Sequence, residues 1–100
     1  MRAGVLIALF FFVVAACNVK NDAVVCDSKT DDAPGSCKAT YDLCAGGTDV
    51  LDCVSGTAGF ACKCVENGTT AKTFTSPDAC NVSVDTRKKR AEDGCGWKLD

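Results

Sequence analysis

The sequence contains no histidine. Histidine is the commonest general base and metal ligand of proteins, and its absence argues against Ser-His-Asp and Cys-His catalysis and against imidazole metal sites. Large apolar side chains are also scarce beyond the first 16 residues, and the chain has one tryptophan and one tyrosine. A core of that size supplies only about 3–5 kcal/mol. We therefore expect covalent cross-links to stabilise the fold.

An apolar segment stands at the N-terminus. After Met1-Arg2, residues 4–16 form an uninterrupted apolar run that ends in small residues. The run is too short to span a bilayer as a helix and fits a secretory signal peptide, so we expect residues 1–16 to be removed, which leaves 84 of the 100 residues. Without Arg2, ten of the eleven cations face thirteen anions. The resulting net charge of about −3 argues against nucleic acid as a partner.

The first cysteine directly follows this run. The stretch Val14-Ala15-Ala16-Cys17 resembles a bacterial lipobox. The resemblance implies cleavage before Cys17, a lipid on its thiol, and attachment to the membrane of a bacterial cell envelope, facing the periplasm or the exterior. Several acyl chains would hold the protein stably, since each buried CH₂ contributes about 0.8 kcal/mol.

The number of cysteines agrees with this interpretation. The chain has nine, and setting Cys17 aside leaves an even set that can close into four disulfides: Cys26, Cys37, Cys44, Cys53, Cys62, Cys64, Cys80 and Cys95. Cleavage by an ordinary signal peptidase after Cys17 leaves the same even number, so a soluble secreted product is the alternative. In its general plan the chain is similar to the small cysteine-rich lipoproteins of some bacteria.

The strongest local signal is Asn67-Gly68, which lies between two segments rich in β-favouring residues. This pair accepts positive φ at both central positions and predicts a hairpin with a type I′ turn. A two-residue loop would place Cys64 opposite Ala71 and Lys63 opposite Lys72. Cys62 and Cys64 would share a face, so their side chains would project in parallel and would not bond to each other.

The rest of the mature chain predicts a small disulfide-rich α+β fold, a three- to four-stranded antiparallel meander with a C-terminal helix. Residues 37–44 and 49–55 have strand patterns, and a short edge strand is expected just before Cys26. Residues 31–36 have the composition of a loop. We expect residues 17–25 to form a lipid-anchored tether and residues 26–100 to form one domain.

The C-terminal segment carries two helix starts. Ser76-Pro77-Asp78 predicts a short turn over residues 77–82, and Ser83 or Asp85 begins a helix to about residue 93. Acidic and basic residues spaced four apart support this helix, and Gly94 suits the position after its end. Trp97 is the best candidate to cover the core.

Two clusters could carry chemistry. Cys62-x-Cys64 could be a redox dithiol or half of a thiolate metal site, but there is no second Cys-x₂₋₄-Cys pair, which favours two structural half-cystines. Asp31-Asp32, with Asp27 nearby, could bind calcium, but the spacing matches no known oxygen-ligand loop. The sequence therefore predicts no catalytic residue, no metal site and no cofactor.

Three further patterns depend on the host. Arg87-Lys88-Lys89-Arg90 resembles a furin-type processing site, although the exposed face of a helix explains it as well. Asn67-Gly68-Thr69 and Asn81-Val82-Ser83 are N-glycosylation sequons, the first of which turn chemistry explains better. The stretch 59–64, Gly-Phe-Ala-Cys-Lys-Cys, is similar to part of an epidermal-growth-factor-like module; the resemblance covers six residues and does not extend to the spacing that follows.

These features favour a non-enzymatic, lipid-anchored extracytoplasmic module with a structural or interaction role. The main alternative is a soluble secreted cysteine-rich toxin, effector or inhibitor. A thiol oxidoreductase that uses Cys62 and Cys64 is a third hypothesis, and it requires an accessible thiolate.

Overall fold

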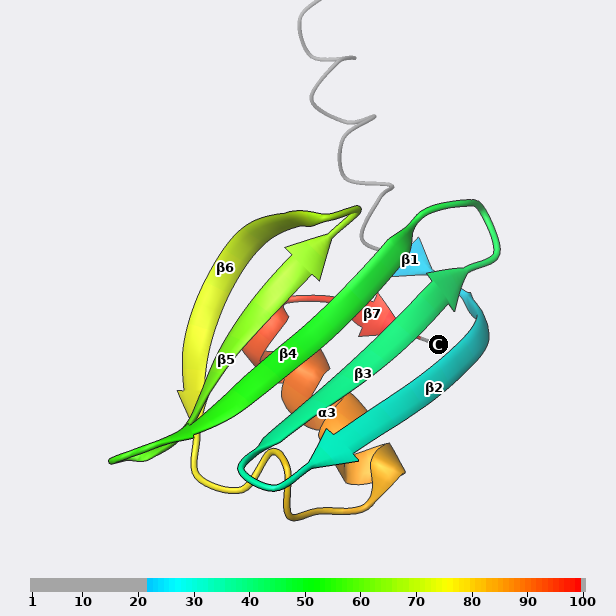
Figure 1. Ribbon diagram of the computed structural model, residues 1–100. Coiled ribbons are helices and arrows are strands. Elements are labelled where there is room, and N and C mark those ends of the chain that lie inside the picture. Colours follow the sequence, from blue (N-terminus) through cyan, green and yellow to red (C-terminus); the bar gives the residue numbers. More distant parts are fainter. Residues whose placement is uncertain (1–21, 100) are drawn as a thin grey trace, which may run out of the picture.

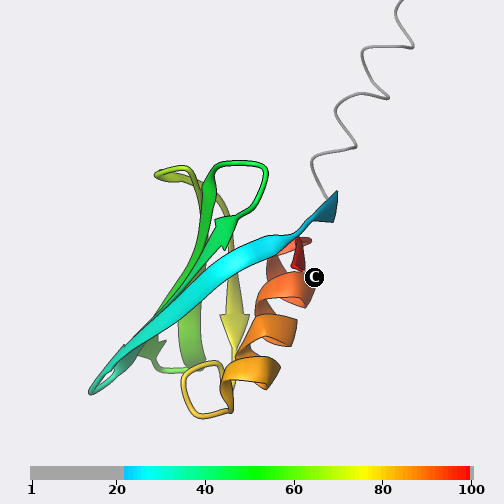
Figure 2. The same cartoon turned by 90° about the vertical axis from the view of Figure 1, so that its right-hand side faces the viewer.

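The computed structural model describes residues 22–99 (Figure 1). Five strands form one antiparallel sheet in the order β2-β3-β4-β5-β6, and a helix, α3, covers one face of it (Figure 2). A second, two-stranded parallel sheet joins β1 to β7. The elements are β1 (Asp22–Ala23), β2 (Val25–Ala33), β3 (Ser36–Leu43), β4 (Thr48–Gly56), β5 (Gly59–Glu66), β6 (Thr69–Ser76), α3 (Val84–Cys95) and β7 (Lys98–Leu99).

The disulfide-rich α+β fold with a meander and a C-terminal helix is confirmed, but the sheet has more strands than the three or four expected. The difference lies in β2, which extends through residues 31–33 instead of ending in a loop. All of its residues after Val25 are exposed, because β2 is an edge strand with a single neighbour. Charged side chains protect such an edge from pairing with other chains, and they also give it the composition of a loop.

The segment 17–25, expected as a tether, contains β1 and the first residue of β2 among its described residues. Ala23 of β1 pairs with Leu99 of β7, which brings the two ends of the described chain together (Figure 1).

The hairpin turn at Asn67-Gly68 is confirmed. Both residues have positive φ, 51° and 86°, as a type I′ turn requires. The Asn67 side chain also accepts a hydrogen bond of 2.8 Å from the backbone N–H of Thr48, which fastens the turn to the start of β4.

The predicted register of this hairpin was wrong beyond its first two pairs. A bulge between Cys64 and Val65 places Cys64 opposite Lys72 and Cys62 opposite Phe74. Lys63 then faces Thr73, so the unfavourable Lys63–Lys72 pair does not form. The extra residue also places Phe74 in the inward-facing row, where its ring packs against the core.

Disulfides connect the layers of the domain. Cys37–Cys80 and Cys64–Cys95 tie the sheet to the segment before α3 and to the last residue of α3. Cys26–Cys44 joins β2 to the residue that follows β3, and Cys53–Cys62 joins β4 to β5. The remaining buried core is small and includes Ala39, Tyr41, Leu51, Phe60, Ala79, Ala91, Trp97 and Leu99.

The helix begins where the sequence indicates and ends later. Ser83 is the N-cap, and its hydroxyl accepts a hydrogen bond from the backbone N–H of Thr86. The expected end at Gly94 was wrong: α3 continues to Cys95, and Gly96, with φ of 76°, adopts the left-handed conformation. Glycine fits at position 94 for a different reason: a Cβ there would lie 2.5 Å from the Phe74 ring.

Candidate functional site

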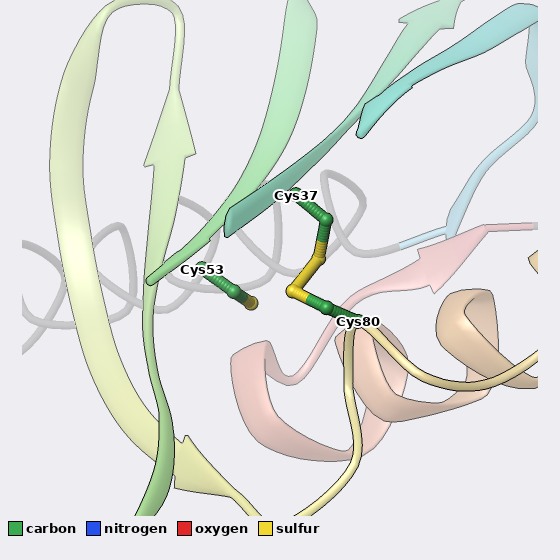
Figure 3. Close-up of side chains that lie close together, drawn as sticks. All are labelled: Cys37, Cys53 and Cys80. Carbon is green, nitrogen blue, oxygen red and sulfur yellow. A yellow bond between two sulfur atoms is a disulfide. The ribbon is translucent and has the colours of Figure 1, made fainter. Parts of the chain in front are cut away.

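The most chemically distinctive cluster is a group of sulfur atoms under the sheet. Cys37, Cys53 and Cys62 are register partners on β3, β4 and β5, so they form one row on the buried face. Cys80 approaches this row from the segment between β6 and α3 (Figure 3). The Sγ atoms of Cys37, Cys53 and Cys80 all lie within 4.8 Å of one another.

These sulfur atoms form two disulfides, Cys37–Cys80 and Cys53–Cys62. A disulfide sulfur is neither the thiolate nucleophile of a redox enzyme nor the thiolate ligand of a zinc site. In addition, Cys37, Cys53 and Cys62 are almost completely buried, so a large substrate has no direct access to them. In this oxidised form the cluster favours a structural role, as the centre of the cross-linked core.

The structure also answers two questions about Cys62 and Cys64. Both side chains lie on the buried face of β5 with at most 1 % exposure, as their spacing predicts. They do not bond to each other: Cys62 pairs with Cys53 and Cys64 pairs with Cys95. The oxidoreductase hypothesis needs an accessible thiolate, and this arrangement provides no support for it.

Arg87 has a structural role that the sequence did not reveal. Its side chain is buried, and its Nε donates a hydrogen bond of 2.9 Å to the carbonyl oxygen of Ala79. Its Nη atoms donate to both carboxylate oxygens of Asp32, at 3.0 and 3.4 Å, and to the carbonyl oxygen of Cys80 at 3.5 Å. One guanidinium therefore joins α3, the segment before it and the edge strand β2.

Arg90 makes a second contact of the same kind. Its Nε and Nη2 donate to the two carboxylate oxygens of Asp78, at 2.9 and 3.0 Å. The hydrogen bond from Arg90 holds the pKa of Asp78 below its usual value. Arg87 and Arg90 are thus engaged within the fold, and the run 87–90 lies inside α3. A protease that binds an extended chain would have to unwind the helix to cut there.

Asp31 and Asp32, two of the acidic residues considered for calcium, do not converge on one point. Asp31 and Asp32 are consecutive residues of β2, so their side chains project from opposite faces of the sheet. Asp32 binds Arg87, whereas Asp31 pairs with Lys38 of β3 in the strand register. The segment is an edge strand and not the acidic loop that its composition indicated.

The two sequons differ in their surroundings. The amide oxygen of Asn67 already accepts the hydrogen bond from Thr48, and this residue forms the hairpin turn. Asn81 lies three positions before Val84, the first residue of α3. Both asparagines are exposed, and they differ in that the Asn67 side chain is engaged in a hydrogen bond that fixes the turn.

A buried hydroxyl lies beneath the sheet. Tyr41 is 3 % exposed, and its hydroxyl has no hydrogen-bond partner within the described part of the chain. Burial raises the pKa of Tyr41, and the positive charge of Arg87 acts in the opposite direction. The phenol is therefore neutral at physiological pH and contributes mainly its ring to the core.

Cys17, the residue predicted to carry the lipid, lies outside the described residues. Within residues 22–99, no helix is long and apolar enough to cross a membrane. No family model matches the chain, and searches of curated proteins and of solved structures also find no match.

Proposed function

We propose that the chain is a non-enzymatic extracytoplasmic module, attached to a membrane by a lipid on Cys17, that has a structural or interaction role. The observation that supports this best is the use of cysteine. All eight cysteines within residues 22–99 form disulfides, which persist in oxidising compartments outside the cytoplasm. Cys17 is then the one thiol of the nine that remains for another purpose.

The difference between the covered and the uncovered face of the sheet also supports an interaction role. The face of the sheet under α3 carries the buried disulfides and the core residues. The opposite face has no element of residues 22–99 above it (Figure 2). Any partner would therefore bind most easily to that open face or to an edge strand.

Metabolic labelling tests the anchor. Cells that express the full chain are grown with radioactive palmitate, and the wild-type protein is expected to carry the label. The variant Cys17→Ser should lose it completely. A Cys26→Ser/Cys44→Ser variant is the matched control, since it loses two cysteines and their disulfide but keeps Cys17, and its label should persist. An unlabelled wild-type protein would refute the anchor.

The alternative, a soluble secreted toxin, effector or inhibitor, is favoured by the same density of disulfides, which is common in small secreted proteins. Mass spectrometry of the mature N-terminus separates the two proposals. A diacyl or triacyl Cys17 supports the anchored module, whereas an unmodified Cys17 or a free Asn18 supports the secreted form. In a host that glycosylates, the secreted form should carry its glycan on Asn81 and not on Asn67, because Asn67 is held in the turn.

A further inference from the structure

The open face of the sheet carries a regular pattern of charge. Four residues pair from strand to strand across the sheet. The pairs are Asp31 with Lys38, Lys38 with Asp52, and Asp52 with Lys63. They alternate with the buried residues of their strands, so they lie on the face opposite α3. We call these four residues the charge row. It crosses β2, β3, β4 and β5 with signs −, +, −, +.

Apolar residues of β4 and β5 lie on both sides of the charge row. Val50 pairs with Val65, and Val54 pairs with Ala61, each pair two residues away from Asp52 and Lys63. Val54 is 51 % exposed, so its side chain is accessible on this face. The ion pairs Arg87–Asp32 and Arg90–Asp78 leave the charge row untouched.

We infer that the partner of this face is a second copy of the chain, packed face to face about a two-fold axis that runs parallel to the strands between β3 and β4. Such an axis reverses the order of the strands in the second copy. Asp31 then faces Lys63 of the other copy, and Lys38 faces Asp52 of the other copy. All four positions of the charge row meet an opposite charge, and each contact occurs twice.

The other in-plane orientation is unfavourable. A two-fold axis perpendicular to the strands keeps the strand order, so every member of the charge row would face its own charge. Like charges at such short separation are repulsive. The alternating order thus selects one geometry of sheet packing, with strands nearly aligned and sheets about 10 Å apart.

The same axis covers the flanking apolar residues. Val54 would lie against Ser36 of the second copy, and Val50 against Thr40, because these residues are register partners across β3 and β4. By the same construction Ala61 would lie against Ala33 of the second copy, and Val65 would pack against the aliphatic part of Lys29. Burial of the four flanking apolar side chains supplies attraction, while the charge row supplies specificity.

The position of the N-terminus agrees with this geometry. The described chain begins at β1, beside the end of the sheet where β2 starts (Figure 1). A two-fold axis parallel to the strands keeps both copies of this end on the same side of the dimer. This arrangement is compatible with two chains that are attached to the same membrane. The dimer identifies a partner for the proposed interaction module. It rests on the proposed lipid anchor only for the argument from the position of the N-terminus.

Sedimentation velocity tests the proposal. The full chain is purified after export and measured in detergent, with micelles in excess over protein. The wild-type protein should show twice the monomer mass at high micromolar concentration. Asp31→Lys and Lys63→Asp should each raise the dissociation constant by about tenfold or more, because each change makes two contacts repulsive. An equimolar mixture of the two variants should regain the dimer, since the lysine introduced into β2 of one chain then faces the aspartate introduced into β5 of the other.

This rescue by mixing distinguishes a lost interface from a misfolded chain. Lys89→Asp, a charge reversal at an exposed position of α3, is the control and should remain dimeric. A wild-type protein that stays monomeric at millimolar concentration would overturn the proposal, as would a dimer that both charge reversals leave unchanged. Neither result would affect the palmitate label on Cys17, so failure of this inference and failure of the proposed function are separate outcomes.

Discussion

The two faces of the five-stranded sheet are built from alternate residues of the same strands, yet they differ in almost every property. Along β4, Leu51 and Cys53 point into the core and are fully buried, while Asp52 and Val54 point away from α3. The inner face holds three of the four disulfides and the helix, and the outer face holds the charge row. The helix and the buried cross-links therefore lie on one face only, and no element of residues 22–99 covers the other face.

The largest effect should come from the sulfur cluster of the inner face. Replacing Cys37 and Cys80 by alanine opens a link between residues 43 positions apart, and chain entropy alone predicts a loss of about 4 kcal/mol. The Cys53–Cys62 link spans 9 positions, and its removal should cost about 2.7 kcal/mol by the same argument. Urea unfolding of both double variants measures the difference. Equal losses in the two variants would show that the length of the closed loop does not determine how much each disulfide stabilises the fold.

A pair of substitutions on β4 compares the two faces directly. Leu51→Ala removes a fully buried side chain and should lower the free energy of unfolding by about 2–5 kcal/mol. Val54→Ala, three residues away on the exposed face, should change it by less than about 0.5 kcal/mol in the monomer. Denaturant unfolding at a concentration where the chain is monomeric provides the measurement. A large loss for Val54→Ala would mean that the outer face also stabilises the monomer.

Gly94 tests how tightly the helix packs on the inner face. Alanine normally stabilises a helix interior by about 1 kcal/mol relative to glycine. Here its Cβ would lie 2.5 Å from the Phe74 ring, so we expect Gly94→Ala to be destabilising, by about 1–3 kcal/mol. Thermal unfolding should show a lower midpoint, and adding Phe74→Leu should recover part of the loss. A higher midpoint for Gly94→Ala would show that the ring moves away freely.

The smallest effect concerns the exposed pair Arg90–Asp78. The pKa of Asp78 is lowered in the folded protein, chiefly by its hydrogen bond from Arg90, so the folded state binds this proton less tightly than the unfolded state. The pair therefore contributes stability above the usual aspartate pKa, and the contribution disappears as the pH falls through the lowered value. Arg90→Ala should be slightly less stable than the wild type at pH 7 and indistinguishable from it at the acid end. Unfolding curves at several pH values measure this, with Lys89→Ala as the control.

Local patterns were sufficient to predict several parts of this fold. Asn67-Gly68 determines its turn through backbone preference alone, and Ser83 caps α3 through one hydrogen bond to the next turn. The strand patterns at residues 37–44 and 49–55 also correspond to β3 and β4. Each of these signals depends on residues close together in the sequence.

The errors arose where distant residues decide the outcome. β2 is a strand because β3 lies beside it, and nothing in its own polar sequence shows that neighbour. The bulge in the β5–β6 hairpin depends on placing Phe74 against the core. Likewise, Arg87 looked like part of an exposed basic run, but the carbonyl groups of Ala79 and Cys80 and the carboxylate of Asp32 surround it in the fold. The pairing of the eight half-cystines was equally beyond the reach of local patterns.

The first disulfide of the chain has a mechanical consequence. A pull on the N-terminus would first separate β1 from β7, which is a contact of only two residue pairs. The load would then reach Cys26, the second residue of β2. Its disulfide to Cys44 links β2 to the residue that directly follows β3. Peeling of the edge strand would stop at that bond. Tension applied at the N-terminus would thus act on the sheet as a whole, and the strands would not separate one at a time.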